Sequence, residues 1–271
     1  MDTFICTTCG AQYAESIEPP QHCPICEDER QFVNWNGQEW TTLAQLQRSH
    51  HNVLRAQGER ITGIGSEPKF AIGQRALLVQ TGEGNLLWDC ISLIDEATVE
   101  AVRPLGGISA IAISHPHYYS SMVDWSERFG NAPIYLHAAD REWVMRHSPN
   151  IQFWDGDRQD LFGGLTLIRC GGHFEGGTVL HWADGEGGEG ALLTGDIIQV
   201  VQDRRFVSFM RSFPNYIPLS ASAVERIVKS VEPFPFKGIY GAWWDATVGE
   251  DGHSAVKRSA ARYLQAIARP D

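Results

Sequence analysis

The sequence predicts a mixed α/β protein with one large domain, preceded by a small module held together by cysteines. From about residue 70 onward, strand-type apolar runs alternate with segments whose apolar residues recur at helical spacing. Two Cys-x-x-Cys pairs lie near the N-terminus, in a stretch with few apolar side chains. The chain of 271 residues is long enough for one large core and one small module.

Charge and hydropathy argue against two classes of partner. The chain carries 22 Lys and Arg against 33 Asp and Glu, a formal net charge of −11. A protein that follows nucleic-acid phosphates needs clustered basic residues, and an anionic membrane surface is an equally poor partner. We find no basic-then-apolar leader and no apolar run near the ~18 residues that a membrane span needs. The sequence predicts a cytoplasmic protein with a small-molecule substrate, and a homodimer stays open.

Residues 1–35 are expected to form a four-cysteine metal module. Cys6, Cys9, Cys23 and Cys26 form two knuckles separated by thirteen residues, and each knuckle can aim two thiolates at one ion. So small a unit needs such a staple to fold. The stretch resembles zinc ribbons and the rubredoxin-like knuckles of rubrerythrins. Zinc is favoured and iron stays open, since sulfur ligands suit both. The module would serve packing or dimerisation, or a one-electron relay if it holds iron.

Residues 36–66 are expected to form a helical linker, and the large domain is expected to span 67–271. Thr41 or Thr42 is a suitable cap for a helix that runs to Leu54. Glycines and a proline over 63–68 would then break the chain.

The large domain is expected to contain strands and helices in alternation. Strands are expected over 70–80, 85–91, 108–113, 133–136, 165–169, 178–181, 191–193 and 238–240. Helices are expected over 95–102, 121–129, 138–146, 220–231 and 254–268.

Two histidines one residue apart, His115 and His117, directly follow the apolar run that ends at Ile113. Residues i and i+2 of an extended segment share a face, so both imidazoles can point at one ion. His173 lies between paired glycines, and Asp196 follows the apolar run 191–193. Three histidines and an aspartate suit zinc with an open position for water.

The order of these motifs resembles the metallo-β-lactamase-fold hydrolases, whose signature is HxHxDH, a later glycine-flanked His, an Asp in a TGD-like turn and a final His. Here the matching stretches are HPHYYS, GGHFEGG and TGD, and the likeness covers roughly residues 60–271. The resemblance implies an αββα sandwich with a metal cleft along one edge of its two sheets. It also implies that His115, His117 and His173 hold one ion, and that Asp196 bridges to a second.

The chain departs from the family at the second ion. Tyr119 and Ser120 stand where the motif has Asp and His, and Gly241-Ala-Trp-Trp stands where the final His is expected. Phenol and alcohol stay protonated at neutral pH and are poor ligands. The sequence therefore predicts a single ion, with His253 as a substitute ligand left open. The glutathione-thioester hydrolases of the family, with their intact two-metal motif and additional helical region, are not favoured.

The predicted function is a metal-dependent hydrolase of a small ester, thioester or related acyl bond, with one zinc or other divalent ion at the histidines. Asp196 would be a fourth ligand or a general base, and Tyr119 or its neighbour Tyr118 would donate to a developing oxyanion. A non-catalytic or redox protein on the same fold stays open.

Overall fold

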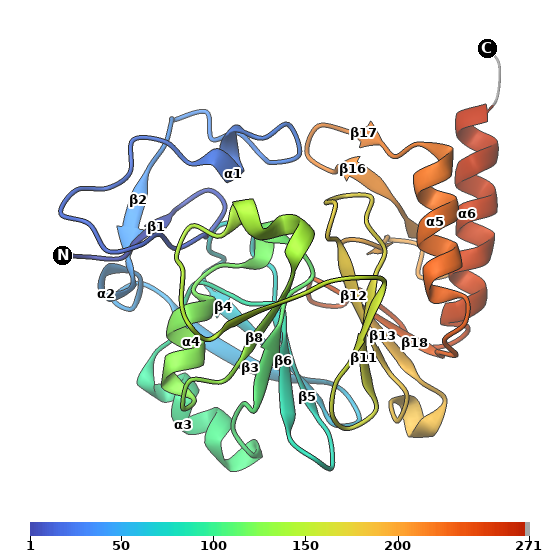
Figure 1. The fold of residues 1–271 in the computed structure, drawn as a ribbon, viewed down its shortest axis with the longest axis horizontal. Helices are drawn as coiled ribbons and strands as arrows, with labels where there is room; N and C mark the ends of the chain where they lie inside the picture. The colour runs from blue at the N-terminus through green and yellow to red at the C-terminus, as the bar shows by residue number, and fades with distance from the viewer. Residues whose placement is uncertain (269–271) are drawn as a thin grey trace.

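The computed structural model describes residues 1–268, in which two β-sheets pack face to face with helices outside (Figure 1). The first sheet has seven strands in chain order: β3 (His51–Gly58), β4 (Ile61–Glu67), β5 (Ala76–Gln80), β6 (Asn85–Trp88), β7 (Ala110–Ala112), β8 (Ile134–His137) and β9 (Ile151–Trp154). Strands β3 to β6 are antiparallel, and β6 to β9 are parallel. The mixed α/β class predicted from the sequence is confirmed.

The second sheet has six strands in the order β10-β11-β12-β13-β18-β19. Their bounds are β10 (Arg158–Asp160), β11 (Leu165–Arg169), β12 (Thr178–Trp182), β13 (Ala191–Gly195), β18 (Gly238–Gly241) and β19 (Thr247–Val248). Strand β18 pairs in parallel with β13, so Gly195 and Gly241 lie side by side at the same end of the sheet.

Three apolar cores separate the four layers. The middle core joins the inner faces of both sheets, with Trp88 and Val79 from one sheet and Leu180, Leu193 and Trp182 from the other. A second core lies under α3 and α4, and a third lies under α5 and α6, which Figure 1 shows on the two outer sides. The helix bounds are α3 (Glu96–Val102), α4 (Met122–Arg128), α5 (Ala221–Val231) and α6 (Gly252–Ala268).

Two of these helices lie where the sequence predicts helices, and each begins with a side-chain cap. Asp95 accepts a hydrogen bond from the backbone of Thr98, and Ser220 accepts one from the backbone of Ala223. The helix expected over 138–146 is instead a short 3₁₀ segment, η3 (Ala138–Trp143).

The N-terminal module contains β1 (Phe4–Cys6) paired with β2 (Trp40–Thr42), and the short helices α1 (Pro24–Glu27) and α2 (Leu43–Leu46). Its own core consists of the cysteines with Ile25, Tyr13 and Ala11. Trp143 and Met145 of the large domain pack against that core.

The prediction of a helix running to Leu54 is wrong. Helix α2 ends at Leu46, after a capping box formed by Thr42 and Gln45, and the chain then enters strand β3. Strands β3 and β4 form the edge of the seven-stranded sheet, so residues 51–67 pack with the large domain. Strand β3 pairs with β4 in a hairpin with a two-residue connection, and this strand pairing outweighs the local helical pattern. The last three residues of the predicted domain lie outside the described residues.

Two short hairpins lie between β13 and α5: β14 (Gln199–Val200) with β15 (Val207–Ser208), and β16 (Met210–Ser212) with β17 (Ile217–Pro218). Figure 1 shows the β16–β17 hairpin facing the α1 region of the N-terminal module. Among residues 1–268, no helix is long and apolar enough to cross a membrane.

A cavity made in the middle core should destabilise the protein, because the two sheets pack together there. Leu180 is fully buried on β12, so Leu180→Ala should lower the free energy of unfolding by about 2–5 kcal/mol. Ile267→Ala, at a position exposed on α6, should change it by less than about 1 kcal/mol. Chemical denaturation measures both, and equal effects would contradict the assignment of Leu180 to the core.

Candidate metal centres

Three histidines converge at one edge of the two sheets. His115 follows β7, and Pro116 then starts the 3₁₀ turn η2 (Pro116–Tyr118), which contains His117. His173 lies in the loop between β11 and β12. His115 and His117 therefore meet across a tight turn, and not along one extended strand as the sequence suggests.

The three rings form a nearly regular triangle with centroids 5.0–5.1 Å apart. One nitrogen from each ring lies within 4.8 Å of the other two, and His117 Nδ1 is 3.2 Å from His173 Nε2. Two nitrogens bound tetrahedrally to one zinc at about 2.05 Å would be roughly 3.3 Å apart. The cluster therefore has the spacing of a metal-binding set, and His115 Nε2 has no hydrogen-bond partner among the described residues.

Hydrogen bonds from outside the cluster orient two of the rings. His173 Nδ1 donates to the main-chain oxygen of Arg211 at 2.7 Å, and because a carbonyl only accepts, His173 Nε2 is left with a lone pair. The Ser114 hydroxyl lies 2.8 Å from His115 Nδ1, and the Ser114 amide donates to the buried carboxylate of Asp89. Both rings thus direct Nε2 toward the cluster.

The residue before His173 must be a glycine. Gly172 has φ of +86°, and a Cβ there would lie 2.9–3.0 Å from side-chain atoms of Ile227 and Leu219. The turn therefore brings His173 inward while the backbone packs directly on α5.

Burial keeps the three imidazoles neutral. Desolvation lowers the pKa of His115 and His117 well below the usual range, and it lowers the pKa of His173 to about 4. Neutral imidazole is the form that binds a metal ion. The cluster is therefore ready to bind a cation at neutral pH.

Asp196 lies at the end of β13, beside His115 and outside the group of three. Its Oδ1 is 3.2 Å from His115 Nε2. Burial raises the pKa of Asp196 to about 7, an effect that the nearby Tyr118 hydroxyl opposes. Gly195 has φ of +54°, and a Cβ there would meet the Ser114 hydroxyl, so the turn before Asp196 needs glycine.

Aromatic and small polar side chains occupy the region of the family's second ion. Tyr118 packs edge-to-face on His115 at 4.4 Å and on Trp243 at 6.5 Å. Tyr119 points elsewhere, with its hydroxyl 3.5 Å from the main-chain oxygen of Asp140. The hydroxyl of Ser120 contacts the main-chain oxygen of Cys90 at 3.3 Å. The phenol beside Asp196 is therefore that of Tyr118.

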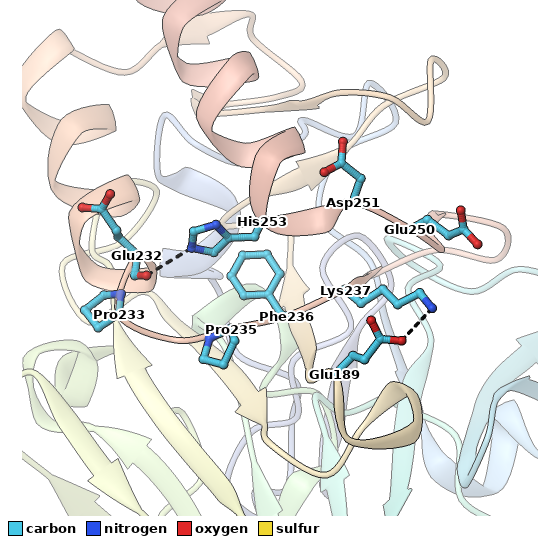
Figure 2. A pocket seen from close by; sticks show the side chains of 9 residues that line it. All are labelled: Glu189, Glu232, Pro233, Pro235, Phe236, Lys237, Glu250, Asp251 and His253. Atoms are coloured by element: carbon cyan, nitrogen blue, oxygen red, sulfur yellow. Dashed lines mark hydrogen bonds and ion pairs between the residues drawn. The ribbon is translucent and has the colours of Figure 1, made fainter.

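His253 lies away from the cluster. Figure 2 shows it lining a surface cavity of about 700 Å³ together with Phe236, Lys237 and several acidic side chains. Its Nε2 donates to the main-chain oxygen of Glu232 at 3.1 Å. Its backbone bonds to Phe236, before β18, whereas Asp196 lies beyond the other end of the neighbouring strand β13, roughly 10 Å away or more. The structure does not bring His253 to the three histidines.

The four cysteines predicted in the N-terminal module converge as a second cluster. Their sulfur atoms lie within 4.8 Å of one another, with Cys6 and Cys26 at 3.5 Å and Cys9 and Cys23 at 3.6 Å. A disulfide needs about 2.05 Å, whereas sulfurs bound tetrahedrally to one zinc lie roughly 3.8 Å apart. Hydrogen bonds among the four thiols lower the pKa of Cys6 and Cys23 and raise the pKa of Cys9 and Cys26.

The N-terminal module covers the histidine cluster, which the sequence did not indicate. His115, His117, His173 and Asp196 are each at most 5% exposed. Phe174 packs against all three imidazoles, and the guanidinium of Arg30 lies 3.8 Å from the centre of the Phe174 ring. Phe174 is adjacent to His173 in the sequence, but Arg30 reaches the site only through tertiary packing.

Two facing sheets with a buried three-histidine cluster at their edge define a candidate metal-binding protein with a sandwich fold. A family model described as the metallo-beta-lactamase superfamily matches residues 72–241, and the chain belongs to this superfamily. Membership supports a metal-dependent, hydrolase-like function with a small-molecule substrate. Superfamily members typically bind divalent metals, and both clusters described above are able to bind one.

The chain is also similar to a curated bacterial protein and, in its fold, to solved structures. The chain is 50% identical over 269 residues to "Uncharacterized protein YmaE" of Bacillus subtilis (strain 168), with 98% of this chain and 97% of that protein covered. Among solved structures it is similar to VMB-1, with a TM-score of 0.59, 14% identity, and 80% and 99% of the two chains covered. It is also similar to the metallo-beta-lactamase FIM-1 from Pseudomonas aeruginosa in its mono-zinc form, with a TM-score of 0.58, 14% identity, and 80% and 97% covered. These two likenesses confirm the predicted fold.

The lowered histidine pKa values predict how metal binding responds to pH. Protons compete for a ligand only below its pKa, so an ordinary site with values near 6.5 loses affinity below about pH 6.5. We expect affinity at this cluster to stay constant from pH 7 down to about pH 5 and to fall as the pH approaches 4, the pKa of His173. Cobalt titrations followed by absorption at each pH would measure it. A steady loss beginning at pH 6.5 would contradict the burial effect.

The cysteine cluster makes a separate prediction about metal content. Cys9→Ser should remove one ion per chain, because a closed four-sulfur site loses a ligand that the buried module cannot replace. Cys170→Ser, at a buried cysteine outside the cluster, should leave the metal content unchanged. Elemental analysis of both variants measures the stoichiometry, and equal metal content would exclude the four-sulfur site.

Proposed function

We propose that the protein is a mononuclear metal-dependent hydrolase that holds zinc at His115, His117 and His173 and cleaves a small ester, thioester or related acyl bond. The observation that carries the proposal is the convergence of three neutral imidazoles at the spacing of a tetrahedral set. The loss of the second ion's ligands at Tyr119 and Ser120 favours a single ion. The fold relative FIM-1, crystallised in a mono-zinc form, supports this stoichiometry.

A bound zinc ion would supply an activated water and would polarise a substrate carbonyl. Asp196 is suited to hold the proton released by the attacking water, because its pKa of about 7 lies close to neutrality and its Oδ1 has no partner among the described residues. Burial raises the pKa of Tyr118 well above its usual range, so this phenol stays protonated and is able to donate a hydrogen bond to a developing oxyanion. We therefore assign the oxyanion donor to Tyr118 in place of Tyr119.

The burial of the cluster favours a second candidate function, a metal-binding protein without turnover on the same fold. The N-terminal module and Phe174 cover the site, and Tyr118 with Trp243 occupies the region of the second ion. Substrate would therefore need the module to move. A redox version of this candidate requires iron at the four cysteines, and a red protein that bleaches on reduction would support it.

The hydrolase proposal predicts a large loss of activity when a histidine is removed. His117→Ala should lower kcat/KM by at least about a thousandfold, because one imidazole of three is lost. Asp196→Asn should lower kcat by about 10²–10⁴-fold with little change in KM, as expected for a lost general base. A panel of nitrophenyl esters, thioesters and phosphoesters, assayed with metal-replete protein, would measure both.

His253→Ala is the matched control, because this histidine lies outside the cluster. It should retain wild-type activity. If the wild-type protein, with a full complement of metal, hydrolyses none of the substrates faster than His117→Ala, the hydrolase proposal fails and the non-catalytic candidate is favoured.

A further inference from the structure

The segment Asp28–Gln31 of the N-terminal module contacts the loop that carries His173. It follows α1, the helix that contains Cys26, so only three residues separate that cysteine from Arg30. Arg30 is buried, and its Nη1 donates to the main-chain oxygen of His173 at 3.3 Å. Its guanidinium stacks on Phe174, the ring that packs against all three imidazoles.

A turn within the module holds Arg30 in this orientation. Asp28 accepts hydrogen bonds from the backbone amide, Nε and Nη2 of Arg30, so the carboxylate and the guanidinium form a bidentate ion pair. Both side chains are mostly buried. Because the pair is neutral overall, Arg30 acts on the histidine loop through its geometry more than through its charge.

The same segment also supports the other hydrogen bond that orients His173. Glu29 pairs with Arg211, whose main-chain oxygen accepts from the His173 ring. The Ser212 hydroxyl and the Asn215 amide bind the main-chain oxygens of Arg30 and Glu29. The ring and the backbone of His173 are therefore both held by groups that the N-terminal module contacts.

We propose that Arg30 is a positioning residue for His173, and that the four-cysteine module, by holding Arg30, sets the metal affinity of the histidine cluster. Partners that orient a metal-binding histidine typically contribute 10–100-fold in affinity. Loss of the Arg30 contacts should therefore weaken the histidine site by about tenfold. This inference rests on the proposed metal site at His115, His117 and His173.

Cobalt binding tests the inference without reference to activity. Cobalt at four thiolates gives intense sulfur-to-metal absorption, whereas cobalt at three imidazoles gives only weak visible bands, so the two sites can be titrated separately in the full-length protein. Arg30→Met keeps an apolar chain against Phe174 and removes the hydrogen bond to His173. We expect a dissociation constant about tenfold higher at the histidine site, with the thiolate absorption unchanged.

The chain contains a matched control for this variant. Arg205 forms the same bidentate ion pair with Asp203, two residues earlier, and its backbone amide also donates a hydrogen bond to that carboxylate. That pair lies on the surface, in the segment between β14 and β15. Arg205→Met should leave both cobalt sites as in the wild-type protein, so an effect confined to Arg30→Met reflects contact with His173.

The outcomes separate this inference from the proposed function. Equal affinity at the histidine site in wild-type protein and Arg30→Met overturns the positioning role and leaves the metal site standing. If wild-type protein shows only thiolate-bound cobalt, the metal site and the inference both fail. Should Arg30→Met lose the thiolate absorption, Asp28→Asn replaces it, because this change frees the guanidinium while leaving Arg30 in place. Unchanged affinity in Asp28→Asn would also overturn the proposal.

Discussion

The candidate metal site is defined by buried polar atoms that receive no hydrogen bond from the surrounding protein groups. An unpaired buried polar group costs about 1–3 kcal/mol, and His115 Nε2 and Asp196 Oδ1 have no hydrogen-bond partner among the described residues. Hydrogen bonds at the Nδ1 atoms of His115 and His173 orient the two rings, and they leave the Nε2 atoms facing the cluster. A cation bound at the centre of the cluster, as proposed above, would offset this cost for the inward-facing nitrogens, because desolvation has kept their lone pairs free of protons.

The two-sheet architecture makes this arrangement rigid. His115 follows a strand of the seven-stranded sheet, whereas Asp196 and His173 follow strands of the six-stranded sheet. The middle core, closed by Trp88 and Trp182, sets the distance between these strand ends. A change in how the sheets pack would therefore separate the ligands, which is why the site needs the whole sandwich and not a single motif.

Sequence reasoning succeeded where the local residue pattern determines the conformation, and it failed where strand pairing or tertiary packing does. The strand at 165–169 and the helix predicted over 220–231 follow from local residue patterns, and the structure has both. Strands β3 and β4 were missed because pairing between them, and not local propensity, determines their conformation. Within the site, the order of His115, His117 and His173 was evident, but the choice of Tyr118 over Tyr119 depends on how η2 turns. The role of Arg30 depends on a contact 143 residues away in the sequence.

The packing of the N-terminal module gives a physical reason why one ion is favoured over two. The main-chain oxygen of Ser120, at the position where the family motif has a second-site histidine, accepts a hydrogen bond from the Gln12 amide of the module. Ser120 itself is buried with φ of +44°, and its small hydroxyl contacts Gln74 and the Cys90 main chain. The N-terminal module therefore contacts the main chain at the position where the family motif has a second-site histidine, which supports the proposal of a single ion.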